Sequence, residues 1–119
     1  MGAYSVTIRT LGTAGEKYQK TLDSIARQSI SPQEVIIVLP KGYPLPPERL
    51  GTETFIFSEK GMVAQRVAGF NACTSDCILA LDDDVEFDSC FVASLFNTMQ
   101  ETGADMVSPV VKETKIWGG

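Results

Sequence analysis

Three consecutive aspartates, Asp82, Asp83 and Asp84, directly follow a run of five apolar residues, Cys77–Leu81. An apolar run of this length is typical of a buried strand, so the carboxylates are expected where that strand ends. Adjacent negative charges repel one another, and none can be buried without a compensating cation. A divalent metal suits this role, because Mg²⁺ and Mn²⁺ prefer hard oxygen ligands. The triplet therefore indicates a metal–phosphate site at the carboxyl end of a strand.

The rest of the chain alternates between strand patterns and helix patterns. Strands are expected at residues 5–10, 34–39, 54–57, 77–81 and 105–111, and helices at 15–28, 62–72 and 89–101. Pro109 favours an edge or a bulge for the last strand. This order predicts one α/β domain, in which helices on both faces cover a mainly parallel sheet.

The first helix carries a start signal and an apolar face. Thr13 and Glu16 have the spacing of a capping box, in which two side chains satisfy free backbone amides. The residues expected on the inward face are Tyr18, Leu22, Ile25 and Ala26. These signals predict an amphipathic helix packed against the sheet.

The two later helices are predicted from similar signals. In the second helix, Val63, Val67 and Phe70 recur at helical spacing. Asp88 is a good N-cap for the third helix, and Phe87 and Val92 flank it as a hydrophobic staple requires.

Composition excludes several function classes. The 119 residues carry a net charge of −5, which makes non-specific binding to nucleic acid or anionic lipid unfavourable. No stretch has the length and apolarity of a transmembrane segment or signal peptide, which favours a cytoplasmic protein. The chain has no histidine, and hence no Ser–His or Cys–His dyad. Cys73, Cys77 and Cys90 are expected to be reduced and mostly buried.

Polar side chains lie at the carboxyl ends of two of the expected strands. Arg9 and Thr10 end the first strand, and the aspartate triplet comes directly after the fourth. In parallel sheets, ligands bind outside the carboxyl ends of the strands, where the strand order reverses. The sequence therefore predicts a nucleotide-sized cleft at this edge.

The segments SVTIRTLG, TLDSIARQS, EVIIVL and KGMVAQRVAGFNACTSDCILALDDDV together resemble the inverting family 2 glycosyltransferases. The resemblance covers residues 5–111. Its most specific part is a G-x-x-x-x-R-x-x-G helix followed by a strand and an acidic triplet, which contains the family's DXD motif. The resemblance implies a GT-A fold, with residues 1–119 as its nucleotide-sugar-binding part.

The family's reaction moves a sugar from a nucleotide diphosphate to an acceptor, with inversion and with help from Mg²⁺ or Mn²⁺. By resemblance, Asp84 binds the metal, Asp82 contacts the metal, the ribose or the base, and Asp83 lies near the ribose or the donor sugar. Thr10 lines the nucleobase pocket, and Arg66 closes the nucleotide side. A UDP-sugar is the default donor, and a carbohydrate or lipid-linked molecule is the acceptor.

The chain also departs from the family pattern. Its first strand ends in Arg9-Thr10-Leu11-Gly12 rather than Pro-Thr-Tyr-Asn, and Leu39-Pro40-Lys41 lacks the acidic residue that binds a uracil. The catalytic base is expected beyond Gly119, so we expect a truncated domain that does not turn over alone. The full-length protein could then be associated with a membrane.

Other interpretations stay open at this point. The triplet could be a solvated acidic turn, Arg66 a surface charge, and Thr10 a residue that satisfies a strand-end amide. The chain could be a non-catalytic nucleotide- or metal-binding module, or a nucleotidyltransferase. The last option expects a basic glycine-rich loop, yet Leu11–Gly15 contains no Lys or Arg. Uncovered apolar surface favours association into a homodimer.

Overall fold

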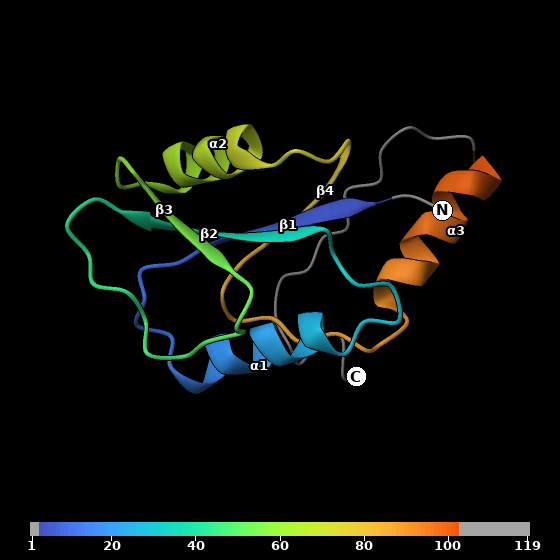
Figure 1. Ribbon diagram of the computed structural model, residues 1–119, viewed down its shortest axis with the longest axis horizontal. Coiled ribbons are helices and arrows are strands. Elements are labelled where there is room, and N and C mark those ends of the chain that lie inside the picture. Colours follow the sequence, from blue (N-terminus) through green and yellow to red (C-terminus); the bar gives the residue numbers. More distant parts are fainter. Residues whose placement is uncertain (1–2, 103–119) are drawn as a thin grey trace.

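A four-stranded parallel sheet forms the centre of the computed structural model, which describes residues 3–102 (Figure 1). Its elements are β1 (Tyr4–Arg9), α1 (Glu16–Ala26), β2 (Glu34–Pro40), β3 (Thr54–Ser58), α2 (Met62–Ala72), β4 (Cys77–Leu81) and α3 (Phe91–Thr102). The bounds of α2 and β4 are those expected from the sequence; β2 and β3 each end one residue later than expected, and β1 begins and ends one residue earlier. The expected strand at 105–111 lies outside the described residues.

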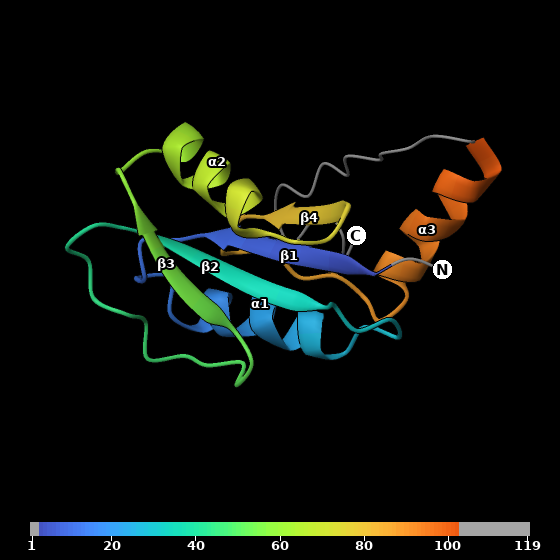
Figure 2. The same ribbon diagram turned by 45° about the horizontal axis from the view of Figure 1, so that its top comes forward.

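The strands are arranged in the order β3-β2-β1-β4. The chain therefore builds outward from β1 through β2 to β3, and then returns to place β4 on the other side of β1 (Figure 2). This reversal is the topological switch point at which α/β sheets bind ligands. Because β1 and β4 are parallel neighbours, with Ile8 paired to Leu81, their polar carboxyl ends lie side by side.

Helices cover both faces of the sheet, as expected. Helix α1 lies on one face and α2 on the other, with α2 contacting β1, β2 and β3 (Figure 1). The buried core lies on the α1 side, where Ile8 and Ile37 of the sheet meet Leu22 of α1. Helix α3 joins this core near the amino end of β1, where the ring of Phe96 packs edge-on against Tyr4 at 5.9 Å.

The expectations for α1 need two corrections. No side chain caps the helix: it begins at Glu16 after Gly15, whose φ of 62° is the left-handed region that glycine adopts readily. The expected capping box is therefore wrong. Ala26 is exposed, whereas Thr21 and Ser24 are buried beside Leu22 and Ile25. The inward face is thus partly polar, because it contacts backbone groups that need hydrogen-bond partners.

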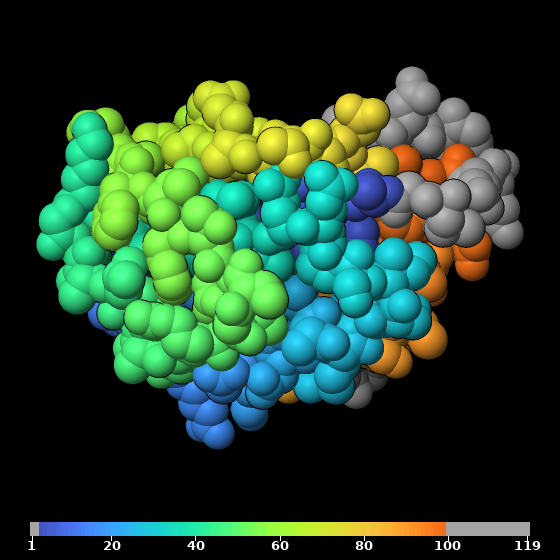
Figure 3. All heavy atoms as spheres, in the orientation of Figure 1, coloured from blue at the N-terminus to red at the C-terminus, as the bar shows by residue number. Residues whose placement is uncertain are grey.

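The apolar side of α2 faces solvent. Exposed fractions there are 54% for Met62, 75% for Val63, 48% for Val67 and 41% for Phe70. We call these four residues the α2 stripe; the helix runs along the top of the surface in Figure 3. The side of α2 that faces the sheet has Gln65 and Gly69 instead.

Close packing explains this inverted helix. A Cβ atom at Gly69 would lie 2.0 Å from Oγ1 of Thr7 and 3.2 Å from a methyl group of Val38. The helix therefore lies so near the sheet that a side chain at position 69 has no room. Its larger apolar side chains occupy the outer side.

Helix α3 begins two residues later than expected. The carboxylate of Asp88 accepts a hydrogen bond from the amide of Cys90 at 3.0 Å, and Phe87 and Val92 are both buried in the core. Cys73 and Cys77 are half-buried free thiols, but Cys90 is exposed, so the expectation of mostly buried cysteines is wrong there. Within residues 3–102, no helix combines the length and the apolarity needed to cross a bilayer.

Candidate functional site

The polar ends of β1 and β4 meet at the carboxyl edge of the sheet, as the sequence predicted. The last paired residues of the two strands are Ile8 and Leu81, so Arg9 and Thr10 extend beyond the pairing beside Asp82 and Asp83. Leu81 is buried, whereas all three aspartates are partly exposed. The edge therefore offers carboxylates, a hydroxyl and a guanidinium to a ligand.

Asp82 lies between two arginines. Its Oδ1 is 3.1 Å from Nη2 of Arg9 and 3.8 Å from Nη2 of Arg66, which comes from α2. Arg9 is therefore held at the site rather than directed into water, as a lone arginine at a strand end would be. Within residues 3–102, neither Asp82 Oδ1 nor Arg9 Nε has a hydrogen-bond partner, so Asp82 Oδ1 is held by ion pairs alone. The arginines compensate part of the charge of the triplet.

Asp83 is tied to the end of β1 through Thr10. The Thr10 hydroxyl donates a hydrogen bond of 2.6 Å to Oδ2 of Asp83 and accepts one of 3.0 Å from the amide of Gly12. Thr10 is only 2% exposed, and Gly12 has a φ of 80°, so the chain turns sharply away from the strand here. Thr10 thus fixes one oxygen of Asp83.

Asp84 is the aspartate left free for a ligand. Within residues 3–102 it has no hydrogen bond or ion pair to another residue. Partial burial raises its pKa above the ordinary value, the negative charges of Asp83 and Asp82 raise it further, and Lys17 opposes the effect. A bound cation would relieve this repulsion.

The three carboxylates do not converge on one point. In the described part of the chain, no group of three or more His, Cys, Asp or Glu residues is arranged to hold a metal ion. Magnesium, however, is commonly held by one or two carboxylates together with substrate phosphates. Asp84 fits this second kind of site. Asp82 fits it less well, because its Oδ1 is engaged by arginines.

Buried polar residues of α1 and of the turn after it hold the segment that follows the triplet. Thr21 Oγ1 donates to the carbonyl of Val85 at 2.7 Å and accepts from its amide at 2.9 Å. Ser24 accepts from the amide of Phe87 at 3.2 Å, and Gln28 donates to the carbonyl of Asp88 at 2.6 Å. Thr21 and Ser24 of α1 therefore satisfy this irregular backbone much as a neighbouring strand would, and fix the chain directly after Asp84. Gln28, after the helix, instead holds the start of α3.

Sequence reasoning missed these residues and one more. Thr21, Ser24 and Gln28 recur at helical spacing, but polar residues in such a pattern usually face water. Gln65 is also buried, and its amide contacts the ends of β1 and β2. The sequence signal for a role of Gln65 at the site was its position, one residue before Arg66 of the family motif.

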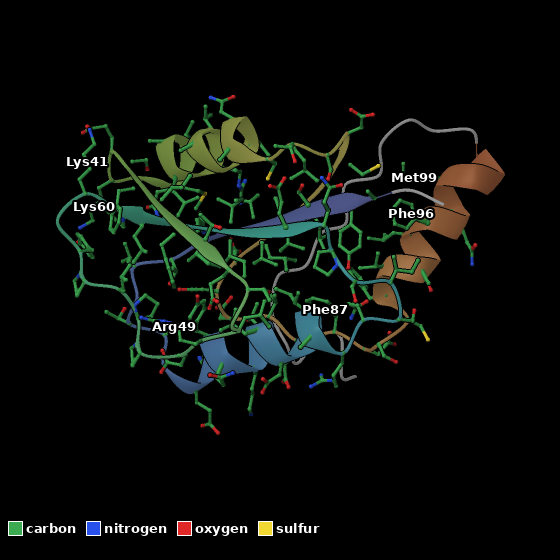
Figure 4. All side chains as sticks on the ribbon, viewed as in Figure 1. Lys41, Arg49, Lys60, Phe87, Phe96 and Met99 are labelled. Carbon is green, nitrogen blue, oxygen red and sulfur yellow. The ribbon has the colours of Figure 1, made fainter. Side chains whose placement is uncertain are left out.

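Other features of the surface lie apart from the aspartates. A cavity of about 440 Å³ is lined by α1 and the start of β2, and an apolar one of about 40 Å³ by β4 and α3; neither contains a predicted site residue. In Figure 4, Lys41 and Lys60 lie at the opposite end of the molecule from Phe96 and Met99. Lys41 pairs with Glu59 at 3.0 Å, and Lys60 lies over the ring of Tyr43.

Comparisons with known proteins identify the family and the fold. The sequence profile described as glycosyl transferase family 2 matches residues 52–116, more than half of the chain, which include α2, β4 and the triplet. The crystal structure of S. aureus TarS 1-349 has a similar fold, with a TM-score of 0.59 and 16% sequence identity. The similarity covers 83% of this chain and 32% of that chain. Among curated protein sequences none matches. The expected GT-A-like α/β fold is therefore confirmed, and the chain spans about a third of the TarS chain.

Proposed function

The chain belongs to glycosyl transferase family 2, and from this membership we propose that it binds the nucleotide-diphospho-sugar donor of an inverting glycosyl transfer. The observation that carries the proposal is the convergence of residues from three elements at one sheet edge. Thr10 follows β1, Arg66 belongs to α2, and the aspartate triplet follows β4. Hydrogen bonds and ion pairs join these residues although they are far apart in the chain.

We assign the nucleoside to the surface formed by Thr10, Asp82 and Asp83. The second oxygen of Asp83 is not used by Thr10, so it can accept a hydrogen bond from a ribose hydroxyl. Arg66 is half-exposed at this edge and can turn toward a phosphate. UDP is the proposed nucleotide, and a carbohydrate or lipid-linked molecule the proposed acceptor.

Asp84 is the proposed ligand of Mg²⁺ or Mn²⁺. An ion held there would stabilise the negative charge of the diphosphate leaving group. The repulsion that raises the pKa of Asp84 also favours a cation at this position. The base that deprotonates the acceptor is proposed to lie outside residues 3–102.

A non-catalytic binding module is the second candidate. The observation in its favour is the engagement of Asp82 by two arginines, which removes one carboxylate from the set that could hold a metal. A module of this kind would bind the nucleotide without transferring the sugar. Binding and turnover must therefore be measured separately.

The test is isothermal titration calorimetry of the protein with UDP-, GDP- and TDP-sugars, with and without Mn²⁺. We expect binding of one nucleotide class, and a loss of about tenfold or more in Asp84→Asn when Mn²⁺ is present. Glu86→Gln is the matched control, because it removes a carboxylate two residues away and should leave the affinity unchanged. If no donor binds to the unaltered protein, the proposed function is wrong. Binding without release of UDP in the presence of acceptors would support the module instead.

A further inference from the structure

Gln65 is a buried amide that connects α2 to the ends of two strands. Gln65 is only 2% exposed, and its Nε2 donates hydrogen bonds to the carbonyls of Thr10 at 3.1 Å and Val38 at 3.0 Å. Its Oε1 accepts a hydrogen bond from the amide of Gly61 at 3.4 Å. All of its polar atoms are therefore directed to the protein backbone.

The contacts of Gln65 fall where β1 and β2 stop pairing. The amide of Thr10 donates to the carbonyl of Val38 at 3.1 Å, and the chain then turns at Gly12. Gln65 donates to the carbonyls of both Thr10 and Val38, so its side chain joins the ends of the two strands on the face that α2 covers. A buried carbonyl that loses its donor is destabilised, which makes this position sensitive to the side chain at residue 65.

The packing of α2 keeps Gln65 in place. One helical turn later, Gly69 lies against Thr7 and Val38 with no room for a Cβ atom. The helix therefore cannot move closer to the sheet, and the glutamine side chain spans a fixed distance. The next residue, Arg66, extends toward Asp82, so one turn of α2 contacts both the end of β1 and the segment after β4.

These contacts continue from Gln65 to the aspartate triplet. Gln65 fixes the backbone of Thr10, and the hydroxyl of Thr10 donates to Asp83 at 2.6 Å. We propose that Gln65 is a positioning residue, which orients Thr10, and through it Asp83, for binding of the donor nucleoside. This inference rests on the proposed function, because it names the residue that organises the same site.

The first experiment compares two glutamines. Gln65→Met keeps the length of the side chain and removes its amide, and Gln28→Met makes the same change at a buried glutamine that donates to Ser24 and Asp88. We expect Gln65→Met to weaken UDP binding in Mn²⁺ about tenfold, and Gln28→Met to change it less than about twofold, at similar losses of melting temperature. Equal losses of affinity in the two variants would overturn the positioning role.

A double-mutant cycle tests whether Gln65 acts through Thr10. Thr10→Val removes the hydroxyl that contacts Asp83. If the two residues act in series, Gln65→Met should cause little further loss of UDP affinity in the Thr10→Val background. Additive losses would show that Gln65 affects binding by another route, and would overturn the proposal.

Backbone NMR separates this inference from the proposed function. Gln65→Met should shift the amide resonances of Thr10, Gly12 and Asp83, and Gln28→Met should leave them in place. Unmoved resonances in Gln65→Met overturn the positioning role, whether or not the protein binds a nucleotide. Shifted resonances, in a protein whose unaltered form binds no donor, would support the positioning of Thr10 and Asp83 and overturn the proposed function alone.

Discussion

Thr10 and Asp83 are 73 positions apart in the chain, and a hydrogen bond of 2.6 Å joins their side chains. The bond connects the end of β1 to the segment after β4, on the two sides of the topological switch point. A hydrogen bond from a hydroxyl to a carboxylate is stronger than one between two neutral groups, because the acceptor carries charge. This contact therefore contributes to stability as well as to the proposed site.

We expect Thr10→Val to destabilise the protein by about 1–2 kcal/mol, because it removes the donor to Asp83 and the acceptor of the Gly12 amide. Thr10→Ser keeps the hydroxyl and should stay within about 0.5 kcal/mol of the unaltered protein. Urea unfolding monitored by circular dichroism measures both. Equal destabilisation in the two variants would contradict this expectation, because the methyl group that Ser lacks would then contribute as much as the hydroxyl that Val lacks.

Arg9→Gln should lower the affinity for UDP about fivefold, because Arg9 compensates a carboxylate that otherwise repels the diphosphate. Its effect on the free energy of unfolding should be within about 1 kcal/mol, since the ion pair is partly exposed. The control is Arg27→Gln. Arg27 is exposed, and its side chain donates a hydrogen bond to the hydroxyl of Ser24. A greater loss of affinity in the control than in Arg9→Gln would contradict the expectation.

The raised pKa of Asp84 gives a pH dependence of known sign. Because the carboxyl holds its proton more tightly when folded, its contribution to stability falls as the pH rises from the ordinary value of 3.8 through the folded pKa. In metal-free solution at pH 7, Asp84→Asn should therefore stabilise the protein by about 0.5 kcal/mol. Thermal unfolding from pH 3 to pH 8 measures this difference, which should vanish in acid.

Glu34 provides the opposite case. A hydrogen bond from Ser5, followed by contacts from Thr74, lowers its pKa below the ordinary value of 4.5. Its contribution to stability is complete above that value and is lost as the pH falls through the folded pKa. Glu34→Gln should thus destabilise the protein at pH 7 and lose its effect in acid. The same direction of change in both variants at pH 7 would contradict the assignment.

Thr21→Val should cost about 2 kcal/mol, because it leaves the buried amide and carbonyl of Val85 without their partner. Thr13→Ala should cost less than about 0.5 kcal/mol, because Thr13 is exposed and does not cap α1. Denaturant unfolding of the two variants decides the matter. A larger cost at Thr13 than at Thr21 would restore the capping box that the sequence predicted.

Self-association remains a prediction from the sequence, and the α2 stripe gives it a location. Among the described strands, β3 pairs only with β2, so its other edge offers unpaired backbone groups as well. We expect Val67→Glu to lower the dimer fraction in sedimentation velocity, and Lys20→Glu, on the exposed side of α1, to leave it unchanged. An unaltered protein that sediments as a monomer would rule the dimer out.

The strands were predictable because their residues carry the signal locally. The apolar run before the triplet bounds β4, and the spacing of the motif bounds α2. Parallel-sheet topology also predicted that Thr10 and the triplet share an edge. The polar face of α1 was not predictable in this way. Its polar side chains accept hydrogen bonds from the backbone of residues 85–88. This contact depends on the tertiary structure, so the spacing of residues within one helix does not reveal it.

The inverted packing of α2 has a consequence for how the chain tolerates change. In most surface helices, a deep mutational scan finds the large apolar positions intolerant and the others permissive. Here we expect the reverse in the isolated domain: Gly69→Ala should be severely depleted because of Thr7, whereas polar replacements of Val63 should survive. Selection for folding alone would then preserve the small and polar residues of α2, and any selection on the α2 stripe would have to come from something that binds it.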